Sequence, residues 1–154
     1  MTDTRTKLEL LLLLLAVSIF IFFTPFLLGS KQPALEASVK QNMDFLQEMV
    51  KKYIEQQKHP PASLAELVRH AREKRYNKTL FNPVLKNTGD AIDRQVVEVY
   101  SEALYQSLGA QFTAKHFAGK TGYYTDGVRY AIYGHLANGE LLQRDGRVLS
   151  LSNH

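Results

Sequence analysis

Glu9 is the residue whose position in the sequence most clearly suggests chemistry, because it is an acid at the start of a long apolar run. Arg5 and Lys7 precede it, and six consecutive leucines follow it. An ionised carboxylate at the edge of an apolar environment is costly unless a cation or water meets it. Our hypothesis is that Arg5 or Lys7 pairs with Glu9, within one chain or between neighbouring copies. The alternative is that Glu9 simply lies among lipid headgroups.

Other residue types that support catalysis form no recognisable pattern. The histidines are scattered along the chain, at His59, His70, His116, His135 and His154, and none has the close spacing of a metal-binding pair. The sequence contains no nucleophile elbow, no glycine-rich phosphate loop and no cysteine. We therefore expect no catalytic residue, no metal, no cofactor and no small-molecule substrate, and the chain is not predicted to be an enzyme.

Basic residues are concentrated in one short stretch of the chain. These cations are Arg69, Arg72, Lys74, Arg75 and Lys78. Such a cluster is able to contact lipid phosphates or an acidic partner, although a solvated helix end is the commoner explanation. The formal net charge of +4 is too small an excess to indicate nucleic-acid binding.

The apolar run that contains Glu9 spans residues 8–28 and has no second charge. A hydrocarbon core of about 30 Å requires about 20 apolar residues in a helix, so the run predicts an uncleaved transmembrane helix. A signal peptide is the main alternative, but its apolar region is usually about 7 to 15 residues long. Positive charge before the run predicts a single-pass membrane protein, with residues 1–7 cytoplasmic and residues 29–154 outside as one small domain.

Helices are predicted in the first part of this domain. Apolar residues recur at steps of three and four over residues 35–54, which predicts a long amphipathic helix. Ser63 and Glu66 have the spacing of a capping box, which predicts a short helix over residues 64–74. A further helix is predicted over residues 92–108, although part of that segment also has β propensity.

The C-terminal third predicts a small antiparallel sheet. Three dipeptides there favour tight hairpin turns, namely Asp126-Gly127, Asn138-Gly139 and Asp145-Gly146. The predicted fold class is therefore α+β. A transmembrane helix runs into a long amphipathic helix, which packs on the C-terminal antiparallel β-sheet.

This order of elements resembles that of type IV pilin-like proteins, and most closely the major pseudopilin of type II secretion. Three segments carry the resemblance: residues 7–10 (Lys-Leu-Glu-Leu), residues 59–67 (His-Pro-Pro-Ala-Ser-Leu-Ala-Glu-Leu) and residues 122–134, which begin Gly-Tyr-Tyr-Thr-Asp-Gly. In the family, a glutamate at the position of Glu9 meets the freed amino terminus of a neighbouring subunit. Thr4 stands where the family has its cleavage glycine, which places Arg5 at the matching amino-terminal position. The acidic, glycine-rich calcium loop of major pseudopilins has no counterpart here.

The resemblance implies a pilin-like (pseudopilin) structural subunit of a type II secretion or type IV pilus-like assembly. Its expected partners are membrane lipid, similar pilin-like subunits and the inner-membrane assembly platform. The alternative is a non-polymerising, single-pass anchored accessory or binding module of an envelope complex, which the missing cleavage glycine favours.

Overall fold

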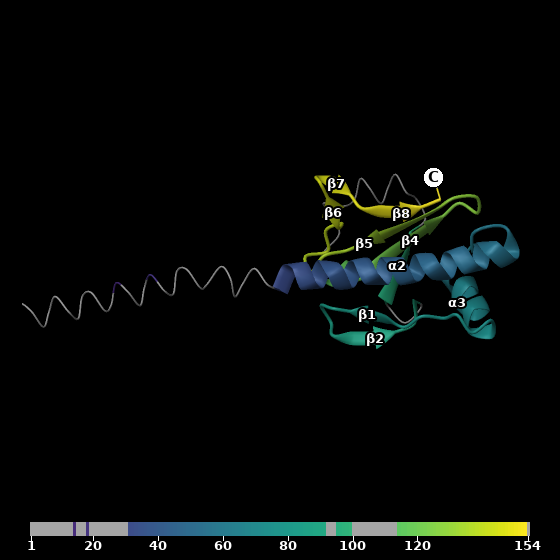
Figure 1. The fold of residues 1–154 in the computed structure, drawn as a ribbon, viewed down its shortest axis with the longest axis horizontal. Coiled ribbons are helices and arrows are strands. Elements are labelled where there is room, and N and C mark those ends of the chain that lie inside the picture. Colours follow the sequence, from purple (N-terminus) through teal and green to yellow (C-terminus); the bar gives the residue numbers. More distant parts are fainter. Residues whose placement is uncertain (1–13, 15–17, 19–30, 92–94, 100–113, 154) are drawn as a thin grey trace, which may run out of the picture. The chain divides into compact units, whose positions relative to one another are not determined.

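The computed structural model describes residues 31–91, 95–99 and 114–153, together with Leu14 and Ser18. The chain divides into two compact units, Met1–Ala34 and Leu35–His154. In the first unit, Leu14 and Ser18 are helical, and the Ser18 hydroxyl donates a hydrogen bond of 2.8 Å to the carbonyl oxygen of Leu14. Helix α2 begins in the first unit, and the other elements described below belong to the second (Figure 1).

The fold class that we predicted is wrong in its transmembrane helix, as far as the described helices are concerned. None of these helices is both long enough and apolar enough to cross a membrane. Helix α2 (Lys31–Gln57) is long, but charged side chains recur along it. Helix α3 (Leu64–Glu73) has 10 residues, where a bilayer requires about 20. Residues 8–28, apart from Leu14 and Ser18, lie outside the part of the chain that the structure describes.

Helix α2 has the amphipathic pattern that the sequence predicts. Its inward stripe consists of Val39, Met43, Leu46, Val50 and Tyr53, each of which is at most 2% exposed. Its outer face is polar and includes two ion pairs at four-residue spacing, Lys40 with Asp44 and Lys52 with Glu48. Exposed pairs of this kind contribute about 0.3 to 0.5 kcal/mol each, so packing of the stripe supplies most of the helix's stability.

Helix α3 begins at the predicted capping box. The Ser63 hydroxyl accepts a hydrogen bond of 3.1 Å from the backbone N–H of Glu66. The Glu66 carboxylate accepts one of 2.9 Å from the N–H of Ala62, one residue before the cap. Two amide groups of the helix entrance are thereby satisfied, which explains why the chain turns into a helix at this point.

Residues 80–89 form a small hairpin. Strand β1 (Leu80–Asn82) pairs with β2 (Asn87–Gly89) in an antiparallel register. On its other side, β1 bonds to a side chain of helix α2: Asn42 accepts a hydrogen bond of 3.1 Å from the N–H of Phe81 and donates one of 2.6 Å to its carbonyl. The buried Asn42 amide therefore replaces a neighbouring strand.

The main sheet has four strands in the order β3-β4-β5-β8. Their bounds are Val96–Val99, Thr121–Thr125, Tyr130–Gly134 and Ser150–Ser152. β3 is parallel to β4, whereas β4–β5 and β5–β8 are antiparallel. The strands of the C-terminal third pair antiparallel with one another, and β3, from outside that third, adds a parallel neighbour, so the whole sheet is mixed. Helix α5 (Ala114–Phe117) precedes β4, and a separate ribbon of two short strands, β6 (Gln143–Arg144) and β7 (Arg147–Val148), lies between β5 and β8.

The predicted helix over residues 92–108 is wrong at residues 96–99, which form β3. The valines of this strand have branched side chains that favour a pleated conformation, and pairing with β4 adds main-chain hydrogen bonds that no local pattern reports. Residues 92–94 and 100–108 lie outside the described part of the chain.

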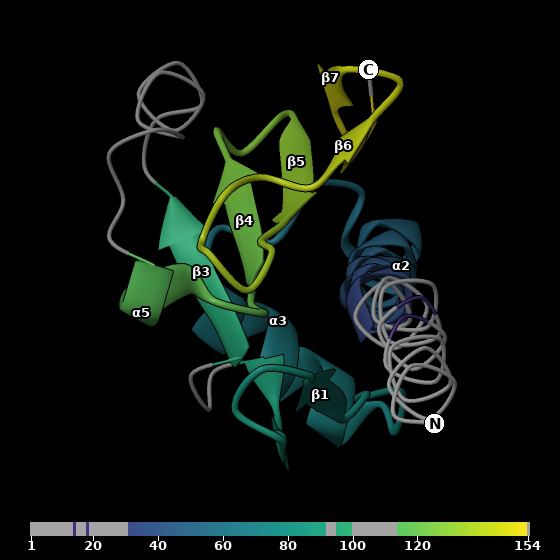
Figure 2. The same cartoon turned by 90° about the vertical axis from the view of Figure 1, so that its left-hand side faces the viewer.

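The core lies between α2, α3 and one face of the main sheet (Figure 2). Strand β5 runs antiparallel to α2, because Tyr130 at its start hydrogen-bonds Gln47 and Gly134 at its end faces Val39 and Met43. Gly134 is the point of closest approach: a β-carbon there would lie 2.6 Å from Cγ1 of Val39 and 2.8 Å from Sδ of Met43. Glycine is thus required at this position for packing.

Candidate functional site

The three residues proposed as an assembly site, Arg5, Lys7 and Glu9, lie outside the described part of the chain. Pairing between them remains a hypothesis from the sequence. The geometry of the described domain draws attention to other places, beginning with the turn between β4 and β5.

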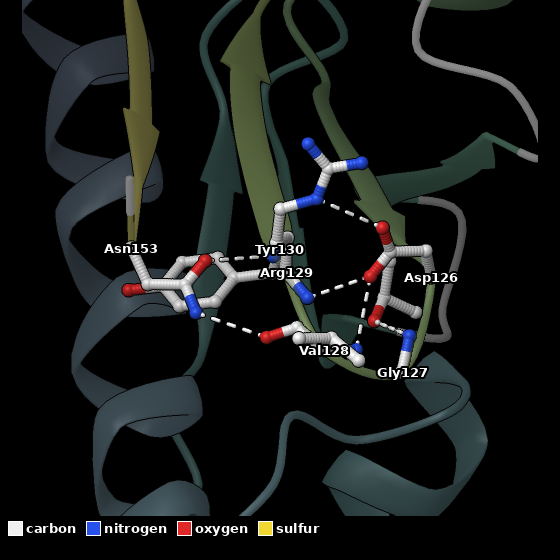
Figure 3. Close-up of polar contacts among 7 residues, drawn as sticks. Asp126, Gly127, Val128, Arg129, Tyr130 and Asn153 are labelled. Carbon is white, nitrogen blue, oxygen red and sulfur yellow. Dashed lines mark hydrogen bonds and ion pairs between the residues drawn. The ribbon is translucent and has the colours of Figure 1, made fainter.

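We use the name hairpin tip for residues 125–130, which connect β4 to β5 (Figure 3). The Asp126 carboxylate organises this turn. Its Oδ1 accepts hydrogen bonds from the backbone N–H groups of Val128 (2.9 Å) and Arg129 (2.6 Å), and its Oδ2 accepts one of 3.0 Å from Nε of Arg129. Gly127 has a φ of 84°, which a residue with a β-carbon adopts only with strain.

These contacts define the charge state of Asp126. Hydrogen bonds from the backbone of Arg129 and Val128, followed by the Arg129 side chain, lower the pKa of the Asp126 carboxyl to about 2. Both oxygens already face donors, so the carboxylate acts as a turn-forming group. Within the described ranges, no three His, Asp or Glu side chains gather in a way that could hold a metal ion.

Asn153, which follows β8, also holds the hairpin tip in place. The side-chain oxygen Oδ1 of Asn153 accepts a hydrogen bond of 2.9 Å from the backbone N–H of Tyr130. Its side-chain Nδ2 donates one of 3.2 Å to the backbone carbonyl of Val128 (Figure 3). The Val128 side chain stays 75% exposed on this fixed turn. A turn whose backbone is already fixed by hydrogen bonds loses little backbone entropy when a partner binds, so the tip is suited to recognition.

A second candidate is the basic ribbon, the name that we use for residues 143–148. In its register Arg144 lies directly opposite Arg147, and the turn between them, Asp145-Gly146, has positive φ at both residues, as a tight two-residue hairpin turn requires. Like charges placed opposite one another on a ribbon are unfavourable. A groove of about 490 Å³ lies beside them and is also lined by Asp145, Val148, Leu149 and Ser150. An anionic ligand would relieve the repulsion.

The sequence contains a signal for this opposed pair of arginines, which we did not predict. The letters Arg-Asp-Gly-Arg place a two-residue turn between two arginines, and a tight turn brings its flanking residues opposite each other. The Asn153 contacts have no such signal, because they join residues that are more than 20 positions apart.

The basic cluster near α3 is partly neutralised in the fold. Arg72 pairs with Asp90 through its guanidinium, and the Lys78 ammonium lies 3.3 Å from the Glu48 carboxylate. The three cations that remain at the end of α3 are exposed, namely Arg69, Lys74 and Arg75. This arrangement resembles a solvated helix end more than a dedicated site.

A polar network joins α2 to α3 inside the domain. The Tyr53 hydroxyl donates a hydrogen bond of 2.5 Å to Glu66, and the hydroxyl of Tyr76 lies 2.6 Å from Nδ1 of His70. Burial, followed by the bond to Glu66, raises the pKa of Tyr53 to about 12, and the same bond lowers the pKa of Glu66. Because Tyr53 is only 2% exposed, the network holds the two helices together and is closed to a substrate.

His135 is a second buried titratable group. It is 2% exposed, and its ring packs on Phe117 with a centroid separation of 4.9 Å. Nδ1 lies 2.8 Å from the carbonyl oxygen of Gly139, and a carbonyl only accepts, so Nδ1 carries the proton. Burial lowers the pKa of His135 to about 4, which keeps the imidazole neutral at pH 7. His154 lies outside the described residues.

Comparisons with protein-family models, with curated proteins and with solved structures found no match for this chain.

Proposed function

We propose that this chain is a pilin-like structural subunit of a type II secretion or type IV pilus-like assembly. In this proposal it is attached to the cell membrane through the apolar run of residues 8–28, and the described domain lies outside. Neighbouring copies and an inner-membrane assembly platform are its partners.

The observation that carries the proposal is the packing of one long helix across a small sheet. Helix α2 begins at Lys31, shortly after the apolar run, and its inward stripe contributes to the core along most of its length. Its outer face remains polar and accessible, with Ala37 and Gln41 among the exposed residues. A helix that is fixed to its own domain on one side is able to contact neighbouring copies on the other.

Two of the segments that resemble the pilin-like family occupy structurally related places. Residues 59–67 make the turn from α2 into α3, including its capping box, and residues 122–134 make the central strands β4 and β5. The Tyr123 hydroxyl joins the two segments by donating a hydrogen bond of 2.9 Å to the carbonyl of Pro61. These contacts support the proposal, because the resembling segments form one continuous part of the core.

The absence of cysteine from the sequence allows a clean test of assembly. Single cysteines at Ala37 or Gln41, on the outer face of α2, should give covalent dimers when membranes containing the full chain are treated with a bifunctional maleimide. A cysteine at Ala65, exposed on α3, is the matched control for random collision. Monomers alone at all three positions would reject a polymerising subunit.

That negative result would favour the second candidate, a non-polymerising anchored binding module. The observation in its favour is the hairpin tip, where Asp126 and Asn153 bond to the backbone of Val128 and its side chain is exposed. A turn built in this way serves recognition of another protein without requiring contacts between copies.

A further inference from the structure

Two turns of the domain project at the end where helix α2 enters it. The first is the basic ribbon. The residues on either side of it, Leu142 and Leu149, are joined by a backbone hydrogen bond of 2.8 Å, and Leu142 lies beside Gly134. Gly134 in turn faces Val39, in the first half of α2. Figures 1 and 2 show β6 and β7 at this end of the domain.

The second turn joins β1 to β2 at residues 83–86. The chain that leads to it runs back along α2, because Lys78 pairs with Glu48 and Phe81 bonds to Asn42, closer to the start of the helix. The turn that follows β1 therefore lies at the same end as the basic ribbon (Figure 1). We use the name entry face for these two turns together.

The entry face combines exposed cations with exposed apolar side chains. The basic ribbon supplies Arg144 and Arg147, with one acid, Asp145, in the turn between them, and Val148, which is 39% exposed. The turn after β1 supplies Lys86 beside Leu85, which is 55% exposed. Among the described residues, none of the three cations forms an ion pair.

We propose that the entry face binds the surface of an anionic phospholipid bilayer, with lipid phosphates in the groove between Arg144 and Arg147. Guanidinium groups bind phosphate oxygens through two parallel hydrogen bonds, and two opposed arginines become favourable once an anion lies between them. Val148 of the basic ribbon and Leu85 of the turn after β1 enter the headgroup layer, where apolar groups gain from leaving water.

The position of the entry face along the chain favours a lipid bilayer, rather than free phosphate, as its ligand. Leu35, where the domain begins, follows the apolar run of residues 8–28 by seven positions. If that run is embedded in lipid, the end of the domain at Leu35 is the end nearest the membrane along the chain. This inference rests on the membrane attachment stated under the proposed function.

The exposed valines provide matched reporters. Val148→Cys lies on the entry face and Val128→Cys lies on the hairpin tip, at the other end of β5. Each variant of the full chain is labelled with an environment-sensitive fluorophore and reconstituted into vesicles that contain phosphatidylglycerol. Vesicle flotation measures attachment, and emission together with quenching by headgroup spin labels measures contact of the labelled turn.

We expect the full chain to float with the vesicles. The label at position 148 should shift its emission to shorter wavelength and be quenched, whereas the label at position 128 should remain as in water. Arg144→Gln combined with Arg147→Gln should return the label at position 148 towards its aqueous emission without releasing the chain. Inorganic phosphate, added to the detergent-solubilised chain without vesicles, should leave the emission unchanged.

Each contrary result overturns a defined part of the proposal. A chain that floats but gives the same aqueous emission at both positions refutes the entry face and leaves membrane attachment intact. A chain that does not float refutes attachment and the entry face with it. A label at position 148 that stays quenched in the arginine double variant refutes the role of the arginines. Circular dichroism of each variant shows that a lost signal does not reflect unfolding.

Discussion

Gly134→Ala tests whether α2 and β5 are packed as closely as the structure indicates. The backbone φ at Gly134 lies outside the positive range that favours glycine, so alanine is conformationally acceptable there. Its methyl group would nevertheless lie 2.6 Å from Cγ1 of Val39 and 2.8 Å from Sδ of Met43, whereas unstrained contacts between carbon atoms lie at about 3.5 to 4.0 Å. The substitution therefore isolates a packing effect.

The stability that Gly134→Ala is expected to lose depends on which of the two neighbouring side chains is able to move. Met43 is unbranched and adapts by rotating its side chain, but Val39 is stiff at its first torsion and both residues are fully buried. Overpacking of this kind typically costs about 1 to 3 kcal/mol, and we expect about 2 kcal/mol here. For a domain of roughly 120 residues that corresponds to a fall in Tm of about 6 to 10 °C.

The assay is thermal unfolding of the full chain in a mild detergent, followed by circular dichroism. Val39→Ala removes the atom that clashes, so Gly134→Ala combined with Val39→Ala should be more stable than the sum of the single effects predicts. Gly146→Ala has open space around the new methyl group but a φ of 74° at its backbone, so it shows the cost of backbone strain without overpacking. Strictly additive effects, or a fall of less than about 2 °C for Gly134→Ala, would refute the close packing.

Three further predictions concern titration and assembly. The pKa of His135 is lowered to about 4 in the folded chain, so between pH 6.5 and 4 the unfolded chain binds a proton that the folded chain does not. The free energy of unfolding is therefore greatest above pH 6.5 and falls by roughly 3 kcal/mol as the pH is lowered to 4. The urea concentration at the unfolding midpoint should fall over this pH range in the native chain and should change less in His135→Gln. The pKa of Asp126 is lowered to about 2, so its stabilisation is present above pH 4 and is lost as the pH falls through 2; a carboxyl ¹³C titration with a midpoint near 4 would contradict this. Glu9→Gln should reduce cross-linked multimers, and unchanged cross-linking would remove the pairing hypothesis.

The sequence predicts well those elements whose causes are local. The stripe of α2, the capping box at Ser63 and the tight turn at Asp145-Gly146 all depend on residues within a few positions of one another, and each is present in the structure. The hairpin tip was also expected, because Asp126-Gly127 is a strong turn signal.

The features that the sequence did not predict depend on distant partners. Segment 96–99 becomes a strand because β4, more than 20 residues later, is available to pair with it. β1 gains its second partner from the side chain of Asn42, which lies 39 positions earlier. The hairpin tip is fixed by Asn153 in the same way. Periodicity and turn chemistry report what a segment prefers alone, and tertiary contacts of this kind override that preference.

One short stretch of α2 connects the helix to the main sheet and to the small hairpin of β1 and β2, and this has a mechanical consequence. Val39 and Met43 sit against Gly134 of the main sheet, and Asn42 between them bonds to Phe81 of the small hairpin. These contacts fall within about one turn of the helix, which rises about 5.4 Å. A force that pulls along the start of α2 is therefore shared at once between the two sheets as a shear load. For the helix to slip, the packing at Gly134 and the hydrogen bonds of the Asn42 side chain would have to break together.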